Sequence, residues 1–99
     1  MQINIKATNA KLTPQSHEII NEKIGSLTKY FSNIISADVE IGINSLHHNK
    51  GNIYKAVVNL SVPKKVLRAS VESTDITKSM NQVRDKLKLE LKKYKDLHK

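Results

Sequence analysis

The sequence predicts a single α+β domain of 99 residues with the element order β-α-β-β-β-α. Four segments alternate apolar and polar residues, which is typical of half-buried strands, and two segments repeat apolar residues every three or four positions, which is typical of helices. The length suits one modest core and leaves no room for a second lobe. We therefore expect residues 1–99 to form an antiparallel-rich, four-stranded sheet with two helices packed on one face.

A strand and a helix open the chain. Near the N-terminus, Ile3, Ile5 and Ala7 alternate with polar residues, so one face of this strand is apolar. Thr13 is a good N-cap for the helix that follows, and Pro14 suits the first helical position because an N–H group there would be unpaired. The apolar stripe of this helix consists of Ile20, Ile24, Leu27 and Phe31.

Three further strands follow the first helix. Asn49 and Gly51 mark the turn between the first two of them, and Pro63, Lys64 and Lys65 turn the chain into the last one. In each of these strands, apolar residues alternate with polar ones, which predicts that the apolar face lies in the core. The residues on that face are Val39, Ile41 and Ile43, then Ala56, Val58, Leu60 and Val62, then Leu67, Ala69 and Val71.

The last helix is the longest element. Ser73, Thr74 and Asp75 are its candidate N-caps. Residues 76–98 span roughly 34 Å at about 1.5 Å per residue, which is longer than the sheet, so we expect the C-terminal turns to project beyond it. The apolar residues step by three or four positions along one side of the helix, and they are Ile76, Met80, Val83, Leu87, Leu91 and Tyr94.

Positive charge is concentrated in the second half of the chain. Residues 1–50 hold five lysines against four acidic residues, whereas residues 51–99 hold twelve basic residues against five acidic ones. Because a helix turns by about 100° per residue, the basic side chains of the last helix fall on two flanks of its apolar stripe. One flank carries Lys86 and Lys93, and the other carries Arg84, Lys88, Lys92, Lys95 and Lys99.

These two flanks favour a polyanion as the partner. Lysine is a flexible point charge that suits phosphate contacts and reads bases poorly. Such a helix reads the shape and charge of a folded nucleic acid better than its sequence, so structured RNA fits best. A row of aromatic residues on which single strands could stack is absent. The alternative is an ordinary solvated surface, because cations are also favoured at helix C-termini, but that preference does not explain so large an excess of basic residues.

Other classes of function have weaker support. The sequence has no cysteine, no zinc-finger spacing, no glycine-rich phosphate loop and no convergent catalytic set. His47 and His48, with His17 or His98 as a third ligand, form only a weak metal-binding pattern. No apolar stretch approaches the roughly 20 residues that cross a bilayer. MQINIKATNA has no basic region followed by an apolar run, so we expect no signal peptide there. We expect a cytoplasmic protein without cofactor, metal, membrane or DNA; a small metal-dependent enzyme is the weakest alternative.

Five segments occur in an order and spacing that match one known family. They are MQINIKATN, LTPQSHEIINEKIGSLTKYF, ADVEIGI, YKAVVNLSVPKKVLRASVES and a final run of DIT, DKLKLEL and KYK. Together they resemble the ribosome hibernation promoting factors, also called ribosome-associated inhibitors or ribosomal subunit interface proteins. The resemblance implies the β-α-β-β-β-α fold, which is similar in outline to a double-stranded-RNA-binding domain.

The resemblance also implies a function. Proteins of this family bind the small ribosomal subunit and its rRNA in the channel of mRNA and tRNA, and they block translation in resting or stressed cells. The chain resembles the short form of the family, and the sequence leaves open whether a separate ribosome-pairing factor works with it. A generic double-stranded-RNA-binding module is the alternative reading of the same basic surface.

The family pattern implies candidate rRNA-binding residues, and this sequence departs from the pattern at two places. Leu89 and Glu90 replace an Arg-Gln pair, which weakens that flank, and Lys64 replaces the glycine of a Pro-Gly-Lys turn, which predicts altered turn geometry. Basic residues of the other flank compensate for the lost arginine. The candidates matched to the family are Lys23, Arg68, Lys86, Lys93 and Lys95, and the compensating candidates are Arg84, Lys88 and Lys92.

Overall fold

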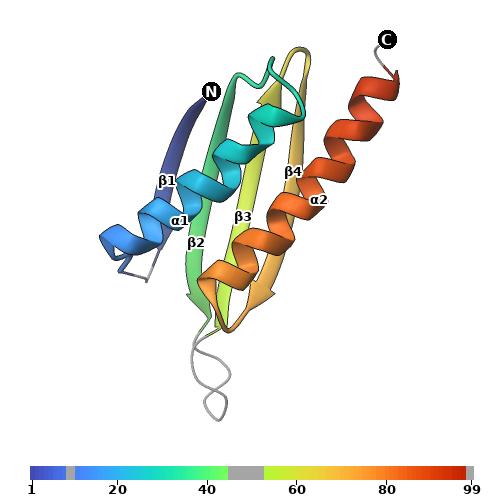
Figure 1. Cartoon of the computed structure of the whole chain (residues 1–99). Helices are drawn as coiled ribbons and strands as arrows, with labels where there is room; N and C mark the ends of the chain where they lie inside the picture. Colours follow the sequence, from blue (N-terminus) through green and yellow to red (C-terminus); the bar gives the residue numbers. More distant parts are fainter. Residues whose placement is uncertain (9–10, 45–52, 98–99) are drawn as a thin grey trace.

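The computed structural model describes residues 1–8, 11–44 and 53–97. Its elements follow the predicted order, with a short 3-10 helix added after the first α-helix (Figure 1). They are β1 (Gln2–Thr8), α1 (Pro14–Gly25), η1 (Ser26–Lys29), β2 (Ser36–Asn44), β3 (Ile53–Val62), β4 (Lys65–Ser73) and α2 (Ile76–Leu97). The α+β fold is therefore confirmed, whereas the predicted turn at Asn49 and Gly51 lies outside the described residues.

The four strands form one mixed sheet in the order β1-β2-β3-β4. β1 runs parallel to β2, and the pairs β2–β3 and β3–β4 are antiparallel. Parallel neighbours need a crossover connection, and α1 supplies it between β1 and β2. The β3–β4 hairpin needs only Pro63 and Lys64 for its turn, since Val62 pairs directly with Lys65.

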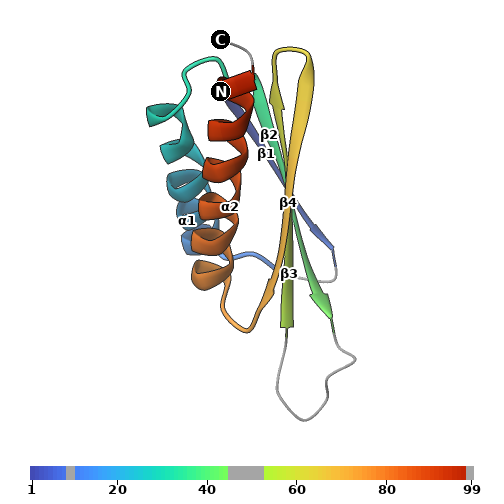
Figure 2. The ribbon, with the colours of Figure 1, turned by 90° about the vertical axis from the view of Figure 1, so that its right-hand side faces the viewer.

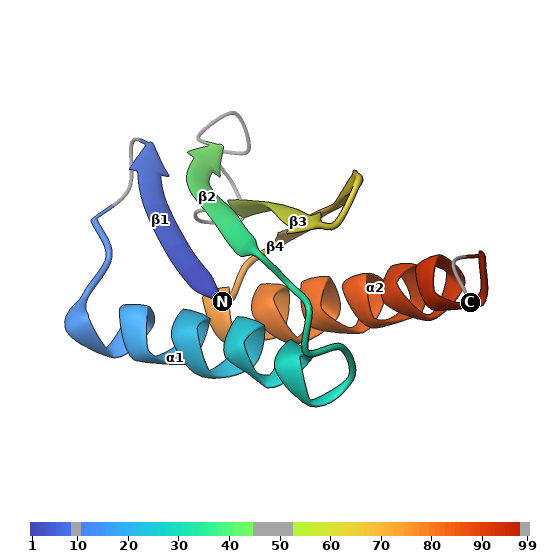
Figure 3. The same ribbon diagram turned by 90° about the horizontal axis from the view of Figure 1, so that it is seen from above.

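Both helices lie on the same face of the sheet, and the described chain places no helix on the other face (Figure 2, Figure 3). The core fills the space between the two layers. Because β1 is an edge strand, Ile3 and Ile5 are only partly buried and Ala7 is exposed. The buried strand residues that face the helices are Ala37, Val39, Ile41, Ala56, Val58, Leu60, Val62, Leu67, Ala69 and Val71.

Both α-helices begin at capping residues that the sequence analysis identifies. Thr13 Oγ1 accepts a hydrogen bond of 3.1 Å from the Ser16 amide, and Pro14 is the first residue of α1. Of the three candidate caps of α2, Asp75 lies directly before the helix, and its Oδ1 accepts a 2.8 Å hydrogen bond from the Thr77 amide. These bonds satisfy amide groups that the first turn of a helix leaves unpaired, so both starting points are fixed.

Aromatic packing ties the C-terminal ends of the two helical segments together. After Gly25 the backbone tightens into η1, which keeps Leu27 in the core. The Phe31 ring then meets the Tyr94 ring edge-on, with the ring centroids 5.4 Å apart. Tyr94 is itself buried, so α2 stays docked almost to its end, and the projection predicted for its C-terminal turns is limited to the last turn, where Leu97 is 74% exposed.

In the β3–β4 turn, the residue at the position where the family pattern has glycine adopts the left-handed backbone conformation. Lys64 has a φ of 67°, and a proline before a residue of positive φ is the arrangement of a type II turn. The Tyr94 hydroxyl donates a 2.7 Å hydrogen bond to the Pro63 carbonyl oxygen, which holds this peptide in place. The turn geometry is therefore compatible with a glycine turn, and Lys64 carries the steric cost of its Cβ.

The docking of α2 predicts a large effect of truncating the residue at the middle of its apolar stripe. Leu87 is fully buried, whereas Leu89 on the same helix is 61% exposed. We expect Leu87→Ala to lower the free energy of unfolding by about 2–5 kcal/mol, and Leu89→Ala to change it by less than about 0.5 kcal/mol. Urea denaturation measures both. Equal midpoints for the two variants would show that the stripe does not dock on the sheet.

The strained turn predicts a stabilising substitution. Glycine adopts a positive φ without steric cost, so we expect Lys64→Gly to raise the free energy of unfolding by roughly 0.5–1 kcal/mol. Lys64→Ala is the matched control, because it removes the same charge and retains the Cβ. Thermal and urea unfolding of both variants check this; a gain in the alanine variant as large as in the glycine variant would assign the effect to charge instead of the backbone.

Candidate nucleic-acid interface

Two adjoining hollows lie between α2 and the segment formed by α1 and η1. The first has a volume of about 510 Å³ and is bordered by α1, η1 and Arg84. The second has a volume of about 600 Å³ and is bordered by Tyr30 and the C-terminal half of α2. Lys29 borders the first hollow and its neighbour Tyr30 borders the second, so the two lie next to each other, and together we call them the inter-helix groove.

Basic side chains from both helical segments line this groove. Three acidic residues, Glu22, Asp85 and Asp96, also line it, so the positive charges outnumber the negative ones. Most of the basic side chains are exposed to solvent and therefore available to a ligand. We call the basic set the groove cations, and they are Lys23, Lys29 and Arg84 in the first hollow and Lys88, Lys92 and Lys95 in the second.

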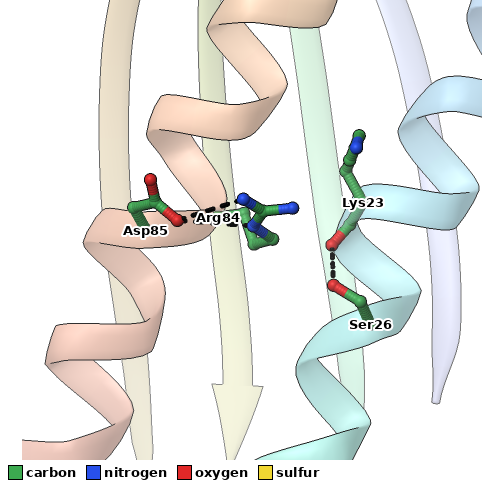
Figure 4. Close-up of polar contacts among 4 residues, drawn as sticks. All are labelled: Lys23, Ser26, Arg84 and Asp85. Atoms are coloured by element: carbon green, nitrogen blue, oxygen red, sulfur yellow. Dashed lines mark hydrogen bonds and ion pairs between the residues drawn. The ribbon is translucent and has the colours of Figure 1, made fainter.

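The first hollow is bordered by Arg84 on one side and Lys23 on the other. Figure 4 shows Arg84 extending from α2 toward α1, where Lys23 and Ser26 lie. Arg84 is only 29% exposed and makes a 3.3 Å ion pair with Asp85, and the Ser26 hydroxyl donates a 2.7 Å hydrogen bond to the Lys23 carbonyl. An ion pair at the surface contributes at most about 1 kcal/mol, so a phosphate can readily replace Asp85 as the partner of Arg84.

The second hollow is organised around Tyr30. The Lys88 ammonium lies 4.3 Å from the centroid of the Tyr30 ring, and the Lys95 ammonium donates a 3.1 Å hydrogen bond to the Tyr30 carbonyl oxygen. Both lysines thus reach from α2 across to the end of the α1–η1 segment. The Lys88 ammonium lowers the pKa of the Tyr30 phenol below its ordinary value, first through hydrogen bonding and then through its charge, with smaller effects from Arg84 and Lys29.

The other flank of α2 faces β4 and stays apart from the groove. The Lys86 ammonium donates a 3.2 Å hydrogen bond to the Ser70 carbonyl oxygen of the edge strand β4. Lys93 forms a 3.7 Å ion pair with Glu90, one turn away on the same helix. The structure therefore confirms the division into two flanks for the described residues, which leave out Lys99, and it gives Lys86 a contact that shields the open edge of the sheet.

Arg68 lies on the opposite side of the molecule from the groove. Its neighbours Leu67 and Ala69 are buried toward the helices, so alternation along β4 places the exposed Arg68 on the uncovered sheet face. Arg68 pairs in register with Asn59 there. The predicted set of rRNA-binding residues therefore occupies three surfaces: the groove, the β4 side of α2, and the outer face of the sheet.

Sequence reasoning did not identify Lys29 and Tyr30 as members of the site. Tyr30 is 42% exposed and contributes an aromatic side chain to the border of the groove. A signal was present, because Tyr30 directly precedes Phe31 and so falls off the apolar stripe of the first helix. The sequence lacks a row of aromatic residues on which single strands could stack, and a single exposed ring is compatible with that.

Neither a cluster of metal-ligating side chains nor a membrane-spanning helix occurs among the described residues. Among residues 1–8, 11–44 and 53–97, no three His, Cys, Asp or Glu side chains lie close enough to hold a metal ion. The weak pattern of His47, His48 and His98 lies outside the described residues. No helix in the described part of the chain is long and apolar enough to cross a membrane.

The contact between Lys88 and Tyr30 predicts how the phenol titrates. We expect Tyr30 to ionise at a lower pH than an ordinary tyrosine, and Lys88→Met to raise its pKa toward the usual value because the nearby ammonium is gone. Absorbance at alkaline pH, taken as the difference from Tyr30→Phe, isolates this group. Lys93→Met on the other flank is the control. An unchanged Tyr30 titration in Lys88→Met would contradict the contact.

Comparison with known proteins supplies relatives for nearly the whole chain. The "Ribosome hibernation promoting factor" of Escherichia coli (strain K12) is 28% identical over 96 residues, which cover 97% of this chain and 95% of the relative. The "Ribosome hibernation promotion factor" of Bacillus subtilis (strain 168) is 26% identical over 95 residues, which cover 96% of this chain and 49% of the relative. The chain thus spans about half the length of the Bacillus relative.

Solved structures and a family match agree with these relatives. A ribosomal subunit interface protein from Coxiella burnetii has a TM-score of 0.85 at 23% identity and covers 97% of this chain and 99% of its own. The N-terminal domain of Thermus thermophilus Protein Y has a TM-score of 0.80 at 18% identity and covers 95% of this chain and 99% of its own. At such low identities, the TM-scores show a shared fold and nothing further. Residues 3–99 match the family profile itself, so the chain belongs to the Sigma 54 modulation protein / S30EA ribosomal protein family.

Proposed function

We propose that this chain is a ribosome hibernation factor that binds the rRNA of the small ribosomal subunit in the cytoplasm. The observation that carries the proposal is the convergence of six groove cations from two separate helical segments on one groove. The names of its relatives support the ribosome as the partner, because they are ribosome hibernation factors. The proposed site is the channel of mRNA and tRNA, where bound protein blocks translation in resting or stressed cells.

The shape of the groove suits an RNA backbone. A Cβ added at Gly25 would meet no atom within 4 Å, so the floor of the first hollow is open at that point. A glycine without a packing role allows a ligand to approach the backbone closely. Lys23, Lys29 and Arg84 line the same hollow, so phosphates that enter it come near all three. Such contacts position a folded RNA without reading its bases.

The three basic surfaces have different roles in this proposal. The groove cations make the main contact with rRNA phosphates. Lys86 and Lys93, on the β4 side of α2, make a second and weaker contact, since that flank offers two basic side chains where the groove offers six, and Glu90 lies beside Lys93. Arg68 faces away from both and contributes little. The bound domain acts by occupying volume, so mRNA and tRNA are excluded and no bond is made or broken.

Three matched double substitutions, each removing two positive charges, test the proposal. They are Lys88→Gln with Lys92→Gln in the groove, Lys86→Gln with Lys93→Gln beside β4, and Lys55→Gln with Arg68→Gln on the outer sheet face. We expect the groove pair to weaken binding to small subunits by about tenfold or more and to lower the slope of log affinity against log salt by about two. The sheet-face pair should bind within about twofold of the wild-type protein.

Sedimentation with separated subunits and cell-free translation measure the two consequences on the same samples, and thermal melting verifies that each variant is folded. Inhibition is expected to fall in parallel with binding. Equal losses in all three pairs would show that only net charge matters. If free duplex RNA competes as well as ribosomes do, the chain is a generic double-stranded-RNA-binding module instead. Inhibition that persists after binding is lost would exclude blocking by occupancy.

A further inference from the structure

Tyr30 occupies an unusual position for an exposed tyrosine. The residue is 42% exposed at the border of the second hollow, which Lys88, Lys92 and Lys95 also line. Leu89, which is also exposed, lines the same hollow and adds apolar surface. The volume of about 600 Å³ is within the range of sites that hold small organic molecules. The hollow therefore offers one flat ring, one apolar contact and three cations.

The backbone of Tyr30 is held from both sides, so the ring sits on a fixed base. Its amide donates a 3.0 Å hydrogen bond to the Leu27 carbonyl, and its carbonyl accepts a 3.1 Å hydrogen bond from Lys95. The next residue, Phe31, packs edge-on against the buried Tyr94. A ring whose backbone is already ordered loses little conformational entropy when it binds a ligand, which favours affinity.

The face of the Tyr30 ring already accepts a positively charged group. The Lys88 ammonium lies 4.3 Å from the ring centroid, at the position of a cation–π contact. At an exposed site such a contact contributes little and exchanges easily. A flat aromatic ligand gains more from the same face, since stacking covers a larger area. The displaced ammonium then remains within the hollow, free to pair with an anion.

We propose that the second hollow is a subsite for one unpaired nucleotide, whose base stacks on Tyr30 and whose phosphate pairs with Lys92 and Lys95. The ligand needs both a flat base and a negative charge, which is the chemistry that a ring among lysines recognises. This inference rests on the proposed function where the nucleotide belongs to rRNA. A free nucleotide has the same chemistry, and the experiments below separate the two sources.

A titration of the isolated protein tests the subsite without ribosomes. Adenosine 5′-monophosphate and the trinucleotide AAA are added while the ring protons of Tyr30 are followed by NMR, with inorganic phosphate as the control for charge alone. We expect the nucleotides to shift the Tyr30 ring protons upfield and phosphate to leave them nearly unchanged. If neither nucleotide shifts Tyr30, or if phosphate shifts it equally, the subsite does not bind a base and the proposal is overturned.

Two substitutions of the ring complete this test. Tyr30→Phe keeps the flat surface and should bind AAA within about twofold of the wild-type protein, whereas Tyr30→Leu keeps an apolar side chain and should bind it roughly 5- to 150-fold more weakly. Affinity for inorganic phosphate should stay the same in both. Equal affinities of the leucine and wild-type proteins for AAA would assign all nucleotide binding to the lysines.

Ultraviolet cross-linking to small subunits identifies the source of the nucleotide. We expect irradiated complexes to yield peptides that carry a nucleotide on Tyr30, and Tyr30→Leu to bind subunits at least fivefold more weakly than Tyr30→Phe. Subunits that bind normally, without a Tyr30 adduct or an effect of Tyr30→Leu, would remove rRNA as the source and leave the proposed function intact. Absence of subunit binding alongside clear nucleotide shifts would overturn the proposed function and retain a site for free nucleotides.

Discussion

The docking of α2 on the sheet is the constraint on which the rest of the structure depends. Leu87 and the other buried residues of its stripe fix the rotation of the helix about its own axis. Once the stripe faces the sheet, one flank must face α1 and the other must face β4. Lys88 therefore reaches Tyr30, while Lys86 reaches the Ser70 carbonyl. The layout of the charged surface is thus a consequence of apolar burial, because residues one position apart on a helix point about 100° apart.

A second constraint operates where the two helical segments end. Tyr94 meets the Phe31 ring on one side and donates to the Pro63 carbonyl on the other, so it joins α2 to both the α1–η1 segment and the β3–β4 turn. This junction explains why the turn keeps its shape with a lysine of positive φ at position 64. It also holds the chain segment that carries Tyr30, which gives the second hollow of the groove one rigid wall.

Features that depend on a single helix or strand could be predicted from the sequence, whereas features that depend on the packing of two elements could not. The flanks of α2 follow from the period of one helix, and they were predicted correctly. Lys29 and Tyr30 join the groove because the chain tightens into η1 after Gly25. The helical period of the sequence does not predict this change from an α-helix to a 3-10 helix. Arg68 was grouped with the helical lysines by family resemblance, although alternation with Leu67 and Ala69 already placed it on the outer face of the sheet.

The division of charge between the faces sets how the domain approaches a polyanion. On the outer sheet face, exposed acidic and basic residues are both present, with Asp38, Glu40 and Glu72 among the acids, so their fields partly cancel. In the groove, the cations outnumber the acidic residues, so the electrostatic field there is positive. At physiological salt the field extends only about 8 Å, which under the proposed function is enough to turn the groove toward RNA before contact. Under the proposed function, electrostatics selects the orientation of binding, and the shape of the groove then selects which RNA surface fits.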